Sequence, residues 1–171
     1  MTAANINTNV IKNTNLKMII ETLGTQIGKE SFLDSSDNPK DPKTCTIKIQ
    51  PDRIVQCAEF LKSQNFSYLS FITAVDFKKE IELVYWFTSI IAGLNIQVKC
   101  SLPRDNPRIP SLVEKFATAD WNEREVYDLF GVNFLNHPNL KRILTWDEFE
   151  GHPLLKKYKV IDEPDEFPIL T

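Results

Sequence analysis

The sequence has few residues of the kinds that carry metal, redox or membrane chemistry. Its three cysteines, Cys45, Cys57 and Cys100, are odd in number and widely spaced, so neither a disulfide framework nor a zinc or iron-sulfur motif is indicated. No stretch approaches the roughly 20 apolar residues that cross a bilayer. The net charge of -3 gives no basic field, which argues against broad binding to nucleic acid.

The remaining composition is that of an ordinary globular protein. Of the 171 residues, 42% are hydrophobic and 25% are charged, which predicts one domain with tails. Residues 1–15 are rich in Asn and Thr and have neither an apolar signal core nor an Arg-rich pattern, so we expect a flexible leader rather than a targeting signal. We predict a core domain over residues 16–117 and a C-terminal helix with an extended arm over residues 118–171.

The spacing of apolar residues predicts both helices and strands in the core domain. Too few helices are expected to cover both faces of a parallel sheet, so we predict an α+β domain of two layers with a mixed sheet. The last three strands are expected to pair as an antiparallel meander. The predicted order is a helix over 16–24, a hairpin of strands 30–34 and 45–49, a helix over 51–64, and strands 68–77, 81–89 and 95–101.

After three prolines, the pattern changes to short helices and loops. Ser111 is expected to open a helix through about Ala117. Asn122, followed three residues later by Glu125, resembles a capping box, which predicts a helix over residues 123–130. Gly131 is suited to end that helix, and the chain through Tyr158 is expected to form an arm extending outside the core, of the kind that a partner orders.

Charged pairs and histidines in this region are the candidates for chemistry. Arg124 and Asp128 have the i,i+4 spacing of an ion pair, and Glu125 is explained by the predicted cap, so no carboxylate is left for catalysis. His137 and His152 each precede a proline, which orients them as anchors. Because a third ligand is missing, structural hydrogen bonding is favoured over a metal site, and we assign no catalytic, cofactor-binding or metal residues.

The segment from Trp121 to Tyr158 has the composition of a protein interface. It is rich in aromatic residues and Arg, which are enriched at interface cores, and Arg142 is suited to bidentate contact with a carboxylate of a partner. Its lysines and acidic residues are equally consistent with solvated surface charge. The sequence therefore predicts an interaction surface rather than an active site.

Several motifs carry a family resemblance over about residues 68–158. The motifs are NEREVYDLFGVNF, HPNLKRIL and FEGHPL, preceded by FITAVDF, ELVYWF and NPRIPSL. With them, the chain resembles the 30 kDa subunit of the respiratory NADH:quinone oxidoreductase (complex I) and its photosynthetic relatives. In the family, GHPL commonly continues as Arg-Lys-Asp-Tyr-Pro, whereas residues 155–159 here are Leu-Lys-Lys-Tyr-Lys, so those family contacts are not carried over.

The resemblance implies a scaffold subunit of the hydrophilic arm of a proton-translocating complex, without a cofactor of its own. FMN, iron-sulfur clusters and quinone would belong to other subunits, and the C-terminal extension would wrap the 49 kDa-type subunit. It also implies a peripheral location on the cytoplasmic side of an energy-transducing membrane, the inner membrane in a Gram-negative bacterium. The alternatives are the equivalent subunit of a membrane-bound hydrogenase-type complex and, if the histidines and carboxylates converge, a small independent metal-dependent hydrolase.

The residues predicted to contact the partner lie on the C-terminal helix and the arm. They are Glu123, Arg124, Glu125, Tyr127, Asp128, Phe130, Gly131, His137, Pro138, Leu140, Arg142, Ile143, Leu144, Gly151, His152, Pro153 and Leu154.

Overall fold

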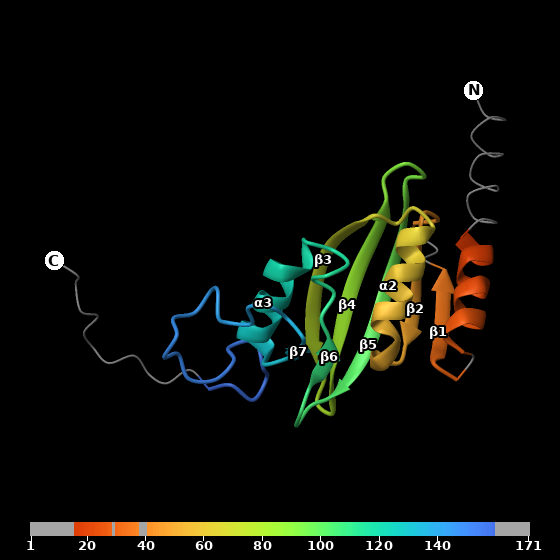
Figure 1. Cartoon of the computed structure of the whole chain (residues 1–171). Helices are drawn as coiled ribbons and strands as arrows, with labels where there is room; N and C mark the ends of the chain where they lie inside the picture. The colour runs from red at the N-terminus through yellow and green to blue at the C-terminus, as the bar shows by residue number, and fades with distance from the viewer. Residues whose placement is uncertain (1–15, 29, 38–40, 160–171) are drawn as a thin grey trace.

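The computed structural model describes residues 16–28, 30–37 and 41–159. The predicted leader over residues 1–15 lies outside the described residues. The main element is a five-stranded mixed sheet in the order β1-β2-β5-β4-β3 (Figure 1). Its strands are β1 (Phe32–Asp37), β2 (Thr44–Ile49), β3 (Tyr68–Asp76), β4 (Glu80–Ser89) and β5 (Leu94–Pro103).

The pairing of the strands confirms the predicted mixed sheet. β1 and β2 form an antiparallel hairpin, β2 runs parallel to β5, and β3, β4 and β5 form the expected antiparallel meander. Along β5, Ile96, Val98 and Cys100 are buried and alternate with half-buried polar residues, which gives the sheet one apolar face. The first strand begins at Phe32 rather than at residue 30, because Glu30 lies in the turn that follows the first helix.

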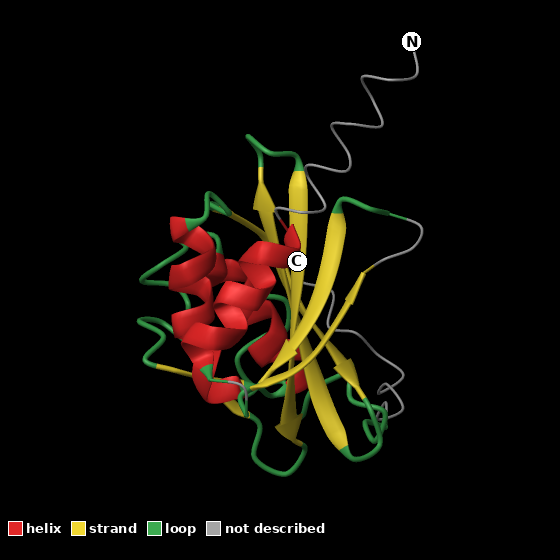
Figure 2. Cartoon of the chain, turned by 90° about the vertical axis from the view of Figure 1, so that its right-hand side faces the viewer, coloured by secondary structure: helices red, strands yellow, loops and turns green. Residues whose placement is uncertain are grey.

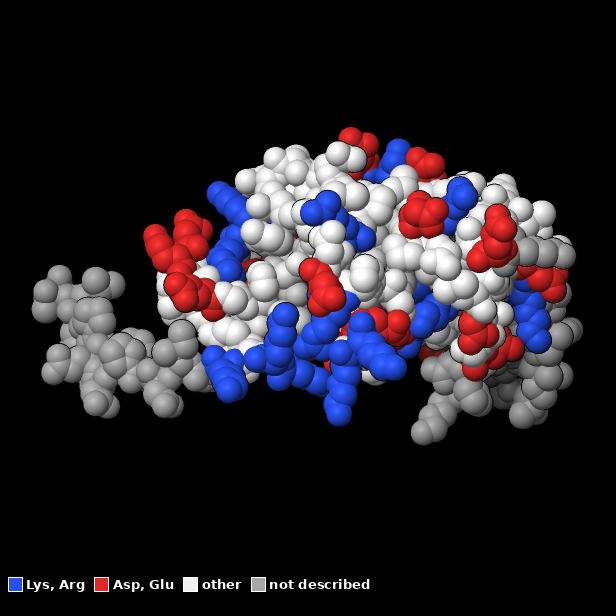
Figure 3. Space-filling model, turned by 90° about the horizontal axis from the view of Figure 1, so that it is seen from below, with Lys and Arg blue, Asp and Glu red and all other residues white. Residues whose placement is uncertain are grey.

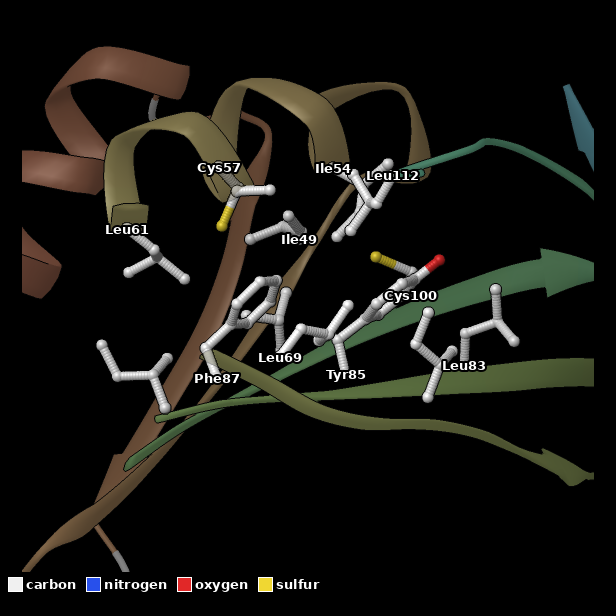
Figure 4. Close-up of a cluster of buried hydrophobic side chains, with 14 of the residues drawn as sticks. Ile49, Ile54, Cys57, Leu61, Leu69, Leu83, Tyr85, Phe87, Cys100 and Leu112 are labelled. Carbon is white, nitrogen blue, oxygen red and sulfur yellow. The ribbon is translucent and has the colours of Figure 1, made fainter. Parts of the chain in front are cut away.

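Helices cover one face of the sheet (Figure 2). The first helix spans residues 16–27, and α2 (Ile54–Ser63) follows a 3-10 turn, η1 (Pro51–Arg53). The first helix passes the predicted end at Gly24, where the Phe32 ring packs 3.6 Å from the position a Cβ would take, and stops at Gly28, whose φ of +89° ends it. Figure 4 shows side chains of α2 meeting those of β3, β4 and β5, and all three cysteines are buried.

The chain between the sheet and the last helix forms turns instead of the predicted helix over residues 111–117. Lys115 and Phe116 both donate their N–H groups to the Leu112 carbonyl, which closes a turn beside the core. Just before it, β6 (Arg108–Pro110) pairs in parallel with β7 (Asn133–Leu135). The sequence predicts neither strand, because three residues are too few to show an alternating pattern.

The last helix, α3 (Ala119–Phe130), begins four residues earlier than predicted. Ala119 is fully buried and starts the helix against the core, so Asn122 lies inside the first turns and donates its side-chain amide to the Thr118 carbonyl at 2.7 Å. The predicted capping box of Asn122 and Glu125 is therefore wrong. Gly131 does end the helix, as predicted, with a φ of +74° and an N–H bond to the Tyr127 carbonyl.

Candidate functional site

The candidate site is formed by α3 and the C-terminal arm, defined here as residues 136–159. Its centre is the fully buried carboxylate of Asp128. One oxygen, Oδ2, accepts the backbone N–H groups of Ile143, Leu144 and Thr145 at 3.0, 2.8 and 2.9 Å. The other, Oδ1, accepts the Thr145 hydroxyl and the Arg142 guanidinium, the latter at 2.7 Å. One side chain of the helix thus fixes four consecutive residues of the arm.

The surroundings of Asp128 keep it ionised. Burial alone would raise the pKa of its carboxyl, but the hydrogen bonds from the Thr145 hydroxyl and from the three backbone N–H groups outweigh burial and lower the pKa below the ordinary 3.8. The carboxylate is therefore charged throughout the physiological range. It acts as a fixed acceptor for the arm.

Arg142 is bound inside the chain rather than to a partner. Besides Asp128, its guanidinium donates to the carbonyls of Phe149 and Gly151 at 2.8 and 3.0 Å and lies 5.7 Å from the Phe149 ring centre. The prediction that this guanidinium is available for a carboxylate of a partner is wrong, because Asp128, 14 residues earlier, already occupies that role. Arg142 closes the loop of the arm upon itself.

The predicted ion pair between Arg124 and Asp128 is also absent from the described part of the chain. Arg124 turns instead to the arm and donates to the carbonyls of Lys141 and Arg142, both at 3.1 Å. Its guanidinium lies 5.3 Å from the ring centre of Trp121, one turn earlier on the same face of α3. Both guanidinium groups of the site therefore stabilise the arm through its backbone carbonyls.

His152 anchors the arm to the end of α3. Its Nδ1 lies 2.8 Å from the Asp128 carbonyl oxygen, and its ring meets Tyr127 edge to face. A Cβ on Gly131 would stand only 2.6 Å from the His152 ring, so this close approach requires glycine. His152 is thus an oriented anchor, as predicted, and the residue that it contacts belongs to the same chain.

His137 anchors the beginning of the arm to the first half of α3. Its side chain is fully buried, and its Nδ1 accepts the Asn139 N–H at 3.0 Å, which leaves the proton on Nε2. This Nε2 faces the Asp120 carbonyl oxygen at 3.3 Å and the carboxylates of Asp120 and Glu123 at 3.4 and 4.0 Å. Three titratable groups from the helix and the arm thus meet in one cluster.

Glu123 is the second fully buried carboxyl of α3 and has an environment opposite to that of Asp128. Its Oε1 accepts the Leu112 N–H at 2.7 Å, whereas Oε2 has no hydrogen-bond partner in the described part of the chain. Burial raises the pKa of Glu123 to about 7; hydrogen bonds from Ser111 and Leu112 oppose this shift, and nearby Asp120 adds to it. Glu123 therefore changes its charge near neutral pH.

A third buried carboxylate, Asp76, holds the far end of the arm. It is 3% exposed and lies at the end of β3, where Arg104 binds it through two nitrogens at 2.6 and 2.9 Å. The backbone N–H of Lys156 donates to Asp76 at 2.7 Å. Sequence reasoning missed this anchor, although an acidic residue at the end of the apolar FITAVD strand was a usable signal.

The residues that could bind a metal or act as a nucleophile are too far apart or too deeply buried to do so. His137 and His152 contact residues eight positions apart on α3, about 12 Å along its axis, so they do not share one site. No group of three or more His, Cys, Asp and Glu suited to a metal ion occurs among the described residues. Burial raises the pKa of the Cys57 thiol to about 12, which keeps it protonated and unreactive.

Large apolar side chains of α3 and the arm point outward. Trp121, Leu144 and Trp146 are 63–65% exposed, and Leu154 is 52% exposed. Trp146 meets the Phe149 ring edge to face at 4.8 Å, so its indole is held at the surface by the arm. Both tryptophans contribute to the aromatic content from which the sequence predicts an interface, but the predicted contact set does not include them.

The residues selected from the sequence divide into three groups by exposure. The structure brings most of them together around Asp128 and His137. The arm packs back on α3 and on the end of β3, which corrects the expectation that it extends outside the core. Buried are Glu123, Arg124, Asp128 and Phe130; half-buried are Tyr127, Gly131, His137, Leu140, Arg142, Ile143, His152 and Pro153; exposed are Glu125, Pro138, Leu144, Gly151 and Leu154.

Comparison with known sequences places the chain beside respiratory proteins. The family model described as "Respiratory-chain NADH dehydrogenase, 30 Kd subunit" matches residues 47–164. The NADH-quinone oxidoreductase C subunit of Moorella thermoacetica is 42% identical over 110 residues, which cover 63% of this chain and 74% of that protein. The equivalent protein of Salinispora tropica is 36% identical over 129 residues, which cover 71% of this chain and 53% of that relative. The chain thus spans about half the length of the Salinispora protein.

Solved structures share the fold. A chain of "the membrane-bound sulfane sulfur reductase (MBS), an archaeal respiratory membrane complex" matches with a TM-score of 0.61 and 28% identity, over 86% of this chain and 96% of that one. "Nqo5 of the trypsin-resistant fragment (1-134)" gives a TM-score of 0.61 at 24% identity, over 71% and 99% of the two chains. Within the described ranges, no helix has the length and hydropathy needed to cross a bilayer.

Proposed function

Because the chain belongs to the family of the 30 kDa subunit of the respiratory-chain NADH dehydrogenase, we propose that it is a non-catalytic scaffold subunit in the hydrophilic arm of a proton-translocating quinone oxidoreductase. FMN and iron-sulfur clusters of other subunits pass electrons from NADH, or from another donor, to quinone. This chain provides a binding surface that helps to hold the cluster-bearing subunits together. It binds no cofactor and no nucleic acid of its own.

The observation that carries the proposal is the division of α3 and the arm into an inward polar side and an outward apolar side. Asp128 binds Arg142 and backbone N–H groups of the arm, so the polar groups of Asp128 and Arg142 face inward, while Trp121, Leu144 and Trp146 are exposed. Tryptophan is among the residues most enriched at interface hot spots. An apolar surface supported by a rigid polar network is suited to binding a protein and has no evident catalytic use.

The partner that we propose is the 49 kDa-type subunit, with the chain peripheral to the membrane on its cytoplasmic side. The exposed members of the predicted contact set, such as Glu125, Pro138 and Leu154, would touch the partner directly. The buried members would contribute by holding the arm in its binding shape, because a preformed surface avoids much of the entropy cost of ordering.

Purification of the tagged full chain from native membranes in mild detergent tests the proposal. We expect cluster-bearing subunits to co-purify, and we expect Leu144→Ala with Trp146→Ala to reduce their recovery about tenfold or more, since two hot-spot truncations cost at least about 1 kcal/mol each. The matched control is Ile90→Ala with Ile91→Ala, which removes exposed side chains from the β4–β5 turn. If the wild-type chain brings no cluster-bearing subunit with it, the proposal fails.

A second candidate is the equivalent subunit of another electron-input complex, such as a membrane-bound hydrogenase-type complex. The likeness to a chain of the archaeal respiratory membrane complex over 86% of this chain favours it. The same purification separates the two candidates. A flavin-bearing, NADH-oxidising subunit in the preparation supports the first, and a complex that reduces its quinone or other acceptor without NADH supports the second.

A further inference from the structure

Two groups of lysines from distant parts of the sequence meet on one face of the molecule. Lys78 and Lys79 form the turn between β3 and β4, and Lys156, Lys157 and Lys159 lie at the end of the arm. All five are exposed. Figure 3 shows Lys and Arg side chains gathered on the face seen from below, in a chain whose net charge is -3. We call these five residues the lysine patch.

The side chains of Asp76 and Arg104, and not those of the lysines, bring the two groups together. Asp76 accepts the N–H of Lys156 at 2.7 Å and the guanidinium of Arg104 at 2.6 and 2.9 Å. The same guanidinium donates to the carbonyls of Phe77 and Lys78 at 3.0 and 3.4 Å. Because the donor to Asp76 is the backbone N–H of residue 156, every residue type except proline keeps this hydrogen bond. The fold therefore fixes where the lysines lie without needing their charge.

Nearby charges do not neutralise the patch. Arg104 and Asp76 cancel each other, and Glu80 turns toward Lys48 and Ser101, at 3.9 and 3.1 Å. Exposed acidic residues do lie nearby, Asp105 in the adjoining loop and Asp147, Glu148 and Glu150 earlier in the arm, but they stand apart from the five ammonium groups. No lysine of the patch has a carboxylate within 4.0 Å among the described residues. Gathering unpaired charges of one sign does not stabilise the fold, because like charges repel.

We propose that the lysine patch binds a short acidic segment of a partner protein. Five ammonium groups on flexible stems bind carboxylates as point charges and tolerate variation in their spacing. The patch is small, and the exposed acidic residues Asp147, Glu148 and Glu150 lie beside it, because Phe149 stacks on Tyr158 at 5.9 Å. These carboxylates confine the positive surface to the five lysines. A short acidic peptide can contact the lysines alone, whereas an extended polyanion such as an anionic membrane or nucleic acid also meets the flanking carboxylates and is repelled.

The test uses the full chain and a fluorescent peptide of ten glutamates as the probe. We expect saturable binding by anisotropy that weakens as salt is added. Lys78→Gln with Lys79→Gln, and separately Lys156→Gln with Lys157→Gln, each weaken the affinity about fivefold, because each exposed pair contributes modestly. Lys17→Gln with Lys43→Gln removes the same charge from exposed sites beside β1 and β2, at the other edge of the sheet, and leaves the affinity within about twofold.

Three outcomes overturn the proposal. Equal weakening in the control variant would show a general charge effect. Binding to phosphatidylserine vesicles without binding to the peptide would assign the patch to a lipid surface. Binding of the peptide only after Asp162, Glu163, Asp165 and Glu166 are changed to amides would assign the patch to the acidic residues of the same chain. Thermal unfolding at the wild-type temperature confirms that each variant is folded.

Discussion

In the sheet, most of the buried side chains are apolar, whereas the C-terminal arm is fixed by two buried carboxylates, Asp128 and Asp76, which accept its backbone N–H groups. A third buried carboxyl, Glu123, lies 4.0 Å from the His137 imidazole of the arm. Asp128 holds the middle of the arm, Asp76 holds its far end, and Glu123 with His137 lies at its beginning. Apolar packing spreads stability over many residues. The arm depends instead on hydrogen bonds to a few buried carboxylates. We therefore expect the arm to open locally while the sheet stays folded.

Replacing Asp128 by alanine should have the largest effect. The change leaves the Arg142 guanidinium and three backbone N–H groups without their acceptor, which costs about 3–5 kcal/mol. The loss should appear as local opening of the arm. Limited trypsin digestion should cut after Lys141 and Arg142 far faster than in the wild-type chain, while hydrogen exchange in β4 and β5 stays slow.

The control for this prediction is Glu125→Ala on the exposed side of the same helix. Its effect should stay within about 0.5 kcal/mol, as for surface sites in general. If Asp128→Ala accelerated hydrogen exchange equally in the sheet and in the arm, the two regions would unfold as one unit. That result would contradict local opening of the arm.

The two fully buried carboxyl groups of α3 predict opposite responses to pH. Glu123 has a pKa raised to about 7 from the ordinary 4.5, so the folded chain binds more protons than the unfolded chain between these values. The free energy of unfolding should therefore fall as pH rises through this window, by up to about 3 kcal/mol. Asp128 has a lowered pKa, so its contribution is present above pH 3.8 and is lost as pH falls below that value.

Urea unfolding of the wild-type chain and of Glu123→Gln at pH 5 and pH 8 checks the first of these effects. The amide keeps an oxygen for the Leu112 N–H but carries no charge, so the variant should lose most of the extra pH dependence. His137, Asp120 and Tyr85 also lie near Glu123 and remain in both chains. Identical pH dependence in the two chains would show that Glu123 is not the group responsible.

The sheet and its meander were predictable because their signal is periodic. Alternation along residues 95–101 identifies β5 and its buried face without any long-range information. The start of α3 was not predictable from its cap residues, because the burial of Ala119 outweighs the pairing of Asn122 with Glu125. Losing a local cap costs about 1 kcal/mol, which is less than burying an apolar turn against the core contributes.

The end of α3 at Gly131, after which the arm follows, was predictable from the sequence, but the packing and the contacts of the arm were not. Asp128 and Arg142 are 14 residues apart, and no spacing rule links an acceptor on a helix to an arginine in a loop. The i,i+4 rule points to Arg124 instead. A substitution of Arg142 consequently cannot separate assembly from folding of the arm, so outward side chains such as Leu144 and Trp146 are the better probes of partner binding.

Gly131→Ala tests the close contact between the end of α3 and His152 of the arm. The residue has a φ of +74°, and the new Cβ would stand 2.6 Å from the His152 ring. Alanine in the left-handed conformation and the displacement of the His152 ring should together lower the free energy of unfolding by about 2 kcal/mol. Urea unfolding and protease cleavage of the arm measure this loss. Adding His152→Ala should make the effect of Gly131→Ala smaller by about 1 kcal/mol; strictly additive effects would contradict the close contact.

Ile47→Val should have the smallest effect and should act on the sheet alone. Ile47 is fully buried in β2, where it pairs with Ser35 of β1 and Val98 of β5. Losing one methyl group there should cost about 0.5–1.5 kcal/mol of global stability, seen as a lower urea midpoint with an unchanged slope. Trypsin cleavage of the arm should keep its wild-type rate, because local opening does not require the sheet to unfold. Faster cleavage in proportion to the lost stability would show instead that the arm is released only by global unfolding, and that the apolar sheet, rather than the buried carboxylates, limits its opening.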